Sequence, residues 1–222
     1  MEQEDLVFLK NVLPFWDKLM KSEKEHLEGR VLRLSFKKGQ RVHEGGDCSG
    51  LLVVKSGRIR AYILSEEGKE ITLFRLFDRD VCILSSSCMM KNINFDIQVD
   101  AEADSEILLI PASVYQSLSQ ANAAVKDFSA EIISSRLSDV MWVVEQVVFM
   151  SLDRRLANYL LEQSSIEGKD ELPVTHEMIA RNIGSAREAV TRMLRYFQNE
   201  GLVSVSRGMV TLIDKKRLMQ IS

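Results

Sequence analysis

Hydrophobic and polar positions follow different periods along this 222-residue chain. Residues 6–29 have the spacing of short helices and are interrupted by Pro14. From Arg30 onward the period changes to two, and glycines separate short β-rich runs at 31–36, 51–54, 59–64, 71–74, 81–84, 95–101 and 106–110. Many short strands divided by turn residues indicate a β-sandwich or jelly-roll barrel.

The helical period returns at residues 123–150, which contain neither Gly nor Pro and predict one long helix. Apolar residues follow one another there in steps of 4, 3, 4 and 3, at Ile133, Leu137, Val140, Val144 and Val147. Met141 and Val148 widen this stripe. The spacing favours a coiled-coil seam over a helix packed only against its own domain, so we expect a parallel homodimer through these residues.

Residues 175–197 predict two short helices joined by a tight turn. Gly184 lies where the turn needs a left-handed or otherwise strained backbone. The second helix is expected to bury Val190, Leu194 and Phe197. Its N-terminal end presents polar side chains, as a recognition helix does in a DNA major groove, at Arg187, Glu188, Thr191 and Arg192. Glu188 and Arg192 are four residues apart, so they can support one another on one face.

An ordinary solvated helix would carry the same charges, but the next residues favour DNA binding. Gly201 ends the second helix. Two β-rich runs at 202–205 and 209–213 follow, separated by Ser206-Arg207-Gly208, which is a hairpin signal. A helix-turn-helix followed by a two-stranded wing is more specific than either part alone.

The charge distribution is uneven. Residues 173–222 carry eight Lys and Arg against four Asp and Glu, a net charge of +4, which leaves −7 for the rest of a chain whose total is −3. A basic C-terminal module on an acidic body fits a DNA contact confined to one end. The sequence contains no apolar run of about 18 residues, its acidic N-terminus lacks a signal-peptide pattern, and three cysteines do not suggest a disulfide framework. We therefore expect a cytoplasmic protein.

The segment IGSAREAVTRMLRYFQNEGLVSVSRGMVTL resembles the winged helix-turn-helix of the Crp/Fnr superfamily of bacterial transcription regulators. The matching positions are Ile183, Gly184, Arg187, Glu188, Val190, Arg192, Leu194, Gly201 and Leu202. The usual Ser before the Arg is Ala186 here, which removes one phosphate contact. The run from Phe36 to Leu73 resembles the cyclic-nucleotide-binding-type barrel of the same superfamily, with glycines at its turns.

This resemblance implies an α+β fold with three parts: an effector-sensing jelly-roll barrel at 1–122, a dimerisation helix at 123–150 and a winged helix-turn-helix at 151–222. It also implies a palindromic operator in double-stranded DNA, RNA polymerase as a partner and a small-molecule effector. Arg192 and Glu188 would contact base edges, and Arg187 a base or phosphate. Phosphate contacts would come from Thr175 and His176 at a helix N-terminus, and more weakly from Arg181 and Arg207.

The residues of the expected pocket argue against cyclic AMP as the effector. The cyclic-AMP-binding relatives carry a Gly-Glu pair and a phosphate-binding Arg, whereas residues 78–111 contain no Gly-Glu pair. The position of the Arg corresponds to Phe95, beside Asp96, and a carboxylate there would repel a phosphate.

Two cysteines, Cys82 and Cys88, flank Ser85-Ser86-Ser87 in what would be a short helix of the pocket. Four interpretations stay open: a haem thiolate, a redox thiol pair, part of a small-molecule pocket, or two buried small hydrophobes. His43, a candidate second haem ligand, falls in a predicted turn and is expected to be exposed. The candidate effector pocket consists of Cys82, Leu84, Ser85, Ser86, Cys88 and Phe95.

Three classes of function compete. The leading one is a homodimeric, effector-controlled transcription regulator, and its alternative is a redox- or haem-based sensor that signals through Cys82 and Cys88. The third class, an enzyme, is disfavoured because the sequence shows no nucleophile–base pair, phosphate loop or metal motif, and its three histidines are scattered.

Overall fold

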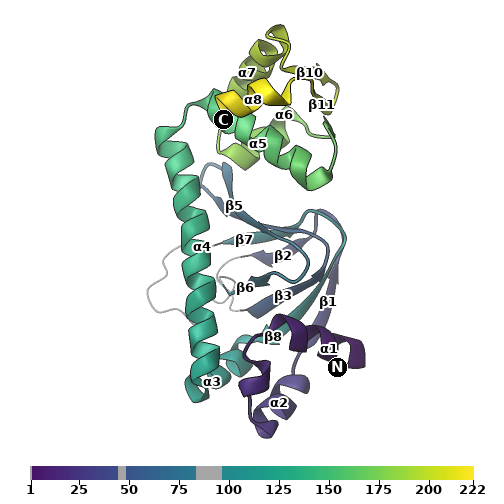
Figure 1. Ribbon diagram of the computed structural model, residues 1–222, viewed down its shortest axis with the longest axis vertical. Coiled ribbons are helices and arrows are strands. Elements are labelled where there is room, and N and C mark those ends of the chain that lie inside the picture. The colour runs from purple at the N-terminus through teal and green to yellow at the C-terminus, as the bar shows by residue number, and fades with distance from the viewer. Residues whose placement is uncertain (1, 45–48, 84–96) are drawn as a thin grey trace. The chain divides into compact units, whose positions relative to one another are not determined.

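The computed structural model describes residues 2–44, 49–83 and 97–222. These residues form two compact units. Unit 1 comprises Met1–Ile63 and Leu73–Val140, and unit 2 comprises Leu64–Thr72 and Met141–Ser222. Figure 1 shows the strands of the first unit, the long helix and the helical C-terminal unit along the chain.

The strands of the barrel form two four-stranded sheets. One has the order β1-β8-β3-β6, built from Leu32–Phe36, Ser105–Pro111, Gly50–Ser56 and Val81–Cys82. The other has the order β2-β7-β4-β5, built from Arg41–Glu44, Gln98–Ala101, Ile59–Leu64 and Glu70–Leu76. The non-sequential order and the antiparallel pairing are those of a double-sheet jelly roll, as the sequence predicted.

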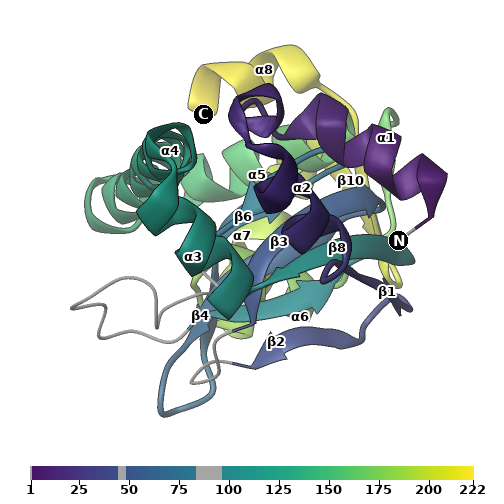
Figure 2. The ribbon, with the colours of Figure 1, turned by 90° about the horizontal axis from the view of Figure 1, so that it is seen from below.

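Strand β3 is buried on both faces, which explains its uninterrupted apolar run. Leu52 and Val54 lie in the cluster between the two sheets. Leu51 and Val53 lie in a second cluster, together with side chains of the helices α1 (Gln3–Val12), α3 (Ala112–Ala121) and the residue Leu27 of α2 (Lys21–Glu28). Figure 2 shows these helices beside the sheet that contains β3 and β8. Because the helices cover its outer face, this sheet needs no polar side.

Two features of unit 1 differ from the sequence-based expectations. The sequence did not predict α3, which lies between β8 and the long helix. His43 was expected in an exposed turn, but it lies on β2, where it is buried and its Nδ1 is 2.9 Å from Ser49 Oγ. The expectation was wrong because the short strand β2 carries Arg41 and Glu44, and its charged ends hid its period of two.

The long helix α4 extends over Ala123–Phe149, where the sequence predicted it. Some of its apolar residues, however, pack against their own chain, whereas others are exposed. Ile133 packs against the helix-covered cluster, and Val140 packs against the cluster between the sheets. The exposed side chains follow steps of 4, 3 and 4, with exposed fractions of 60%, 55%, 44% and 62% at Leu137, Met141, Val144 and Val148. We call these four residues the exposed seam. Ile133 and Val140, two residues of the predicted seam, are thus partly covered by their own chain.

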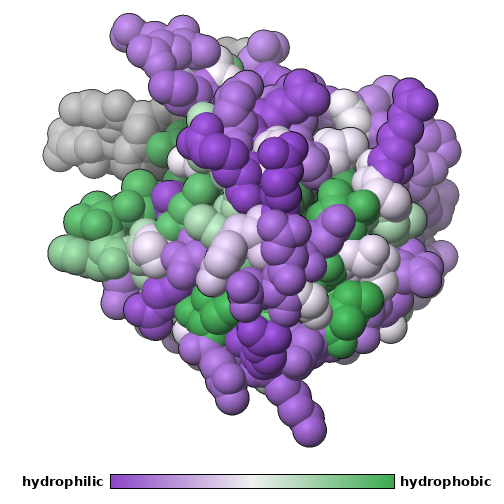
Figure 3. Space-filling view, turned by 90° about the horizontal axis from the view of Figure 1, so that it is seen from above, coloured by the Kyte–Doolittle hydropathy of each residue, from purple (hydrophilic) through white to green (hydrophobic). Residues whose placement is uncertain are grey.

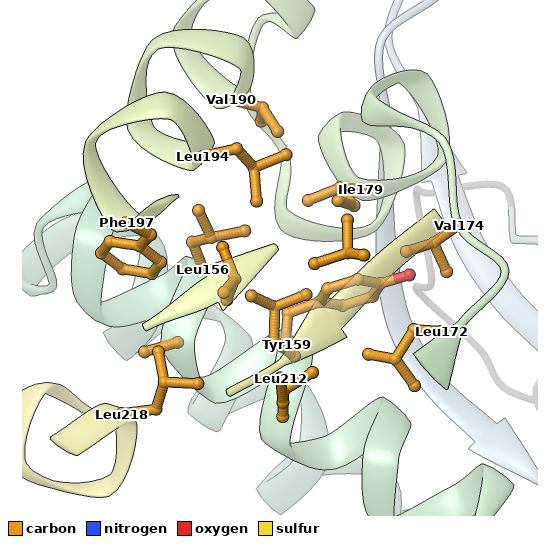
Figure 4. Close-up of a cluster of buried hydrophobic side chains, with 14 of the residues drawn as sticks. Leu156, Tyr159, Leu172, Val174, Ile179, Val190, Leu194, Phe197, Leu212 and Leu218 are labelled. Atoms are coloured by element: carbon orange, nitrogen blue, oxygen red, sulfur yellow. The ribbon is translucent and has the colours of Figure 1, made fainter. Parts of the chain in front are cut away.

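Unit 2 is a helical domain with a small sheet. Its elements are α5 (Leu152–Glu167), β9 (Glu171–Leu172), α6 (His176–Ile183), α7 (Arg187–Asn199), β10 (Val203–Ser206), β11 (Met209–Leu212) and α8 (Lys215–Ile221). The sheet order is β10-β11-β9. The sequence predicted the pair of helices and the hairpin, but not β9 or α8. Figure 4 shows the single core, in which Leu194 and Phe197 of α7 meet Leu156 of α5 and Leu218 of α8.

Candidate nucleic-acid interface

Helix α6 begins at a cap and ends at a glycine, both as the sequence predicted. The Thr175 hydroxyl accepts a hydrogen bond from the Met178 backbone N–H at 3.1 Å, which satisfies one of the free donors of the first turn. Ile179 and Ile183 are buried in the core. Gly184 has a φ of +61°, a left-handed conformation that ends the helix and turns the chain toward α7.

Helix α7 is fixed by its apolar rear and exposes its polar tip. Val190, Leu194 and Phe197 are buried in the core. Arg187, Glu188 and Arg192 are exposed near the N-terminal end. Within the described part of the chain, neither Glu188 nor Arg192 forms an ion pair, so the mutual support expected between them is absent. Among the residues that the structure describes, neither side chain has a partner that a ligand would have to displace.

The wing follows α7 directly. Strands β10 and β11 pair from Val203↔Leu212 to Ser206↔Met209, and Arg207-Gly208 form the turn between them. Gly208 has a φ of +73°, as the turn requires. Arg207 is exposed at the tip. The hairpin thus carries a cation on the same domain as the α7 tip.

One pocket lies where α6, α7 and the wing meet. Its volume is about 310 Å³, and it is lined by Thr175, His176, Glu177, Arg187, Val205, Ser206, Arg207 and Gly208. Two arginines, one carboxylate and one imidazole share this space. The net positive charge and the free N–H groups at the start of α6 suit a phosphate group. We call this space the cationic pocket.

His176 and Thr191 connect the two helices of the motif. His176 Nδ1 is 2.9 Å from Thr191 Oγ1, and the Thr191 hydroxyl donates to the Arg187 carbonyl oxygen at 2.9 Å. Burial lowers the pKa of His176 below its ordinary value, and the positive charge of Arg187 lowers it further. The imidazole is therefore mainly neutral at pH 7 in the free protein.

Arg181, a weaker candidate for phosphate contact, already lies near carboxylates. Its guanidinium is 3.4 Å from Glu177 and 3.9 Å from Glu70, both within unit 2. Half of the side chain is exposed. A phosphate would have to compete with these carboxylates, so Arg181 contributes less than Arg187 or Arg207.

One positioning residue was missed by sequence reasoning. Arg155 on α5 is partly buried, and its Nη1 donates to the Ile183 carbonyl oxygen at 2.9 Å. This bond satisfies a carbonyl at the C-terminal end of α6 and ties that end to α5. The only sign of it in the sequence is an arginine within the apolar stripe of Leu152, Leu156 and Tyr159.

The candidate effector pocket is largely outside the described residues, which exclude Leu84, Ser85, Ser86, Cys88 and Phe95. Cys82 is described. It lies on strand β6 rather than in a short helix, and it is fully buried in the apolar cluster between the sheets. Of the interpretations left open for this cysteine, the buried small hydrophobe fits this position. Among the described residues, no group of three or more His, Cys, Asp or Glu is placed to hold a metal ion.

A jelly-roll barrel, a long helix with an exposed apolar seam and a winged helix-turn-helix define a DNA-binding regulator. Comparison with known proteins agrees. Residues 154–221 match the Crp-like helix-turn-helix domain, and residues 33–122 match the cyclic nucleotide-binding domain. A solved structure of a transcriptional regulator assigned to the Crp/Fnr family of Eubacterium rectale is 49% identical, with a TM-score of 0.93, and the match covers 95% of this chain and 98% of that one.

Curated relatives are more distant. The anaerobic regulatory protein of Pasteurella multocida is 25% identical over 92% of this chain and 77% of its own length. The transcriptional regulator SdrP of Thermus thermophilus is 31% identical, but that match covers 42% of this chain and only 49% of the relative. The chain belongs to the Crp/Fnr family of DNA-binding transcription regulators and is not an enzyme. No helix of the described ranges is both long and apolar enough to cross a bilayer.

Proposed function

We propose that the protein is a homodimeric, sequence-specific regulator that binds a palindromic operator and is controlled by an effector at its barrel. The observation that carries the proposal is the tip of α7, where Arg187, Glu188 and Arg192 are exposed while the rear of the helix is locked in the core. A rigid helix with free polar side chains at its N-terminal end is suited to enter a major groove.

Each polar side chain of the tip has a role that its chemistry supports. Arg192 would form two hydrogen bonds with a guanine edge, and Glu188 would accept one from a cytosine amino group. Arg187 lies beside the cationic pocket and would contact a base or a phosphate. Thr175, His176 and Arg207 would hold the DNA backbone, which fixes the position of the tip without carrying sequence information.

The exposed seam supports dimerisation. Leu137, Met141, Val144 and Val148 repeat with the 3.5-residue period of a two-stranded coiled coil and are open to solvent. Val147, 43% exposed, would flank the contact. Pairing this seam with a second copy would cover the apolar side chains and present two α7 helices to successive major grooves. We therefore propose the division 1–122 for effector sensing, 123–150 for dimerisation and 151–222 for DNA binding.

The effector is the least defined part of the proposal. The absence of a Gly-Glu pair, together with Phe95 and Asp96 at the phosphate position, argues against cyclic AMP. A redox or haem role for Cys82 is not favoured, because its thiol is buried among apolar side chains that raise the cost of a thiolate. We expect a small molecule instead, with RNA polymerase as a partner on DNA in the cytoplasm.

In vitro selection from a pool of random duplexes tests the DNA-binding role. Wild-type protein should enrich a palindrome whose half-sites lie about one helical turn apart. Arg192→Ala should lose this enrichment while keeping the wild-type oligomeric state. Glu188→Ala should relax the preference at one base pair of each half-site by about 1–3 kcal/mol. The matched control is Arg195→Ala, which removes an exposed arginine one turn further along α7 and should keep the preferred sequence.

Two results would count against the proposal. If wild-type protein enriches no sequence, the proposal of a specific operator is wrong. If Arg192→Ala enriches the same palindrome as wild type, Arg192 does not recognise bases. If Arg195→Ala loses the same base preference, the base-contacting residues have been assigned to the wrong part of α7.

A further inference from the structure

The hydrogen bonds around Thr191 determine which nitrogen of His176 carries a proton. A hydroxyl group has a single hydrogen, and the Thr191 hydroxyl donates it to the Arg187 carbonyl oxygen, which can only accept. Thr191 Oγ1 must then accept from His176 Nδ1, 2.9 Å away. The neutral imidazole therefore has its hydrogen on Nδ1, and its Nε2 is left with a lone pair.

That tautomer cannot bind a phosphate. A phosphate oxygen is an acceptor, and so is the Nε2 of the neutral ring, so the two repel. Protonation of Nε2 converts it into a charged donor, which forms the stronger class of hydrogen bond with phosphate. His176 lines the cationic pocket, so the same side chain opposes a phosphate when neutral and favours it when protonated.

The charged groups that face His176 come from each of the three elements around it. They are Glu177 on α6, Arg187 on α7 and Arg207 on the wing. In the free protein burial lowers the pKa of His176, and the positive charge of Arg187 lowers it further. A DNA phosphate bound between the arginines would supply the missing negative charge and reverse this balance.

We propose that His176 takes up a proton when the DNA backbone enters the cationic pocket, and that Thr191 is the positioning residue that orients the imidazole for this contact. The proposal rests on the proposed DNA-binding function and adds to it the protonation of His176. Thr191 was expected to contact DNA directly. Its hydroxyl is instead engaged with Arg187 and His176, so its contribution is to hold the ring.

The sign of the pH dependence follows from linkage. His176 binds more protons in the complex than in the free protein, so DNA affinity falls as pH rises between the two pKa values. The free value lies below the ordinary 6.5 for histidine. For one site, the dissociation constant should rise by up to about 10-fold for each pH unit within that window, and a dimer that engages both half-sites should show a steeper rise.

Fluorescence anisotropy with the full chain and a mixed-sequence duplex of about 30 base pairs at low salt provides the test, because a backbone contact needs no operator. Wild-type affinity should fall several-fold for each pH unit between pH 6 and pH 8. His176→Gln donates from a neutral amide and should bind with little dependence on pH. His176→Arg keeps a permanent charge and should retain the affinity that wild type shows at low pH.

Matched variants distinguish the effect of the His176–Thr191 contact from general effects of pH on DNA binding. His26→Gln removes an exposed histidine on α2 and should leave the wild-type pH profile unchanged. Thr191→Val removes the acceptor for His176 Nδ1 and should flatten the profile, while Thr191→Ser should restore it. Proton NMR of the three imidazoles should show the pKa of His176 rising when the duplex is added.

Two results would overturn the proposal while leaving DNA binding intact. One is a His176→Gln variant with the wild-type pH profile, and the other is a His176 pKa that does not rise in saturating duplex. Wild-type protein that binds no duplex between pH 5.5 and pH 8.5 would overturn both this proposal and the proposed function.

Discussion

A charge placed in the exposed seam should split the proposed dimer. Val144 lies in the middle of the seam and is 44% exposed, so about half of its side chain remains to be covered by a partner. Full burial of a valine contributes roughly 1.5–3 kcal/mol, and the covered part therefore about 0.7–1.3 kcal/mol in each protomer. Val144→Asp removes this contribution at almost the same side-chain volume.

The substitution also brings two carboxylates together across the symmetry axis. At a separation of about 6 Å and an effective dielectric constant of about 20, they repel by about 3 kcal/mol. Together with the burial lost in both protomers, the dimer should weaken by roughly 4–6 kcal/mol, which solvent screening will reduce. We expect the dissociation constant to rise by at least about 100-fold.

Sedimentation equilibrium over a range of protein concentrations measures this constant. Ser135→Asp is the matched control, because Ser135 is exposed on α4 but lies away from the seam. Its dimer should match wild type. The reasoning is refuted if Val144→Asp leaves the dissociation constant unchanged, or if Ser135→Asp weakens the dimer equally.

Three further predictions concern stability and are checked by thermal or urea denaturation. Gly184→Ala forces a side chain into a φ of +61° and should destabilise unit 2 by about 1–2 kcal/mol, whereas Gly29→Ala, at a φ of −74°, should not. Leu194→Ala leaves a cavity behind α7 and should cost about 2–5 kcal/mol, and a smaller loss would mean that the core collapses around it. A hydrogen bond from Lys215 holds the pKa of Asp170 below its ordinary value. The folded form thus favours the carboxylate, so Asp170→Asn should be less stable than wild type at pH 7. The difference should begin to shrink as the pH falls to the ordinary pKa of 3.8 and should be lost as the pH passes through the lower pKa of the folded form. A difference that shows no decrease below pH 4 would contradict this.

Short-range signals in the sequence predicted the DNA-binding module well. The cap at Thr175 and the turn at Gly184 depend on neighbouring residues, and the structure confirms both. The buried rear of α7 also follows from spacing alone, because only one of its faces is apolar. These features required no knowledge of the rest of the chain.

Local signals do not decide which apolar stripe of α4 is exposed. Helix α4 carries apolar residues around much of its circumference, so a period of 3.5 fits more than one stripe. The barrel covers Val140 and leaves Met141 exposed. This difference depends on tertiary packing, which the local sequence does not specify. The contact between Thr191 and His176 was missed for a related reason: the two residues are 15 positions apart in the sequence and lie on different helices.

The two-sided burial of β3 has a consequence for synthesis. Leu52 pairs with Leu109 of β8, so the ribosome makes the most apolar strand more than fifty residues before its principal partner. At about 5–20 residues per second, the edge of β3 that pairs with β8 waits roughly 3–11 s for its partner. A nascent chain stalled before residue 105 should therefore bind holding chaperones. Once synthesis resumes and β8 has emerged, the chaperones should dissociate from the chain.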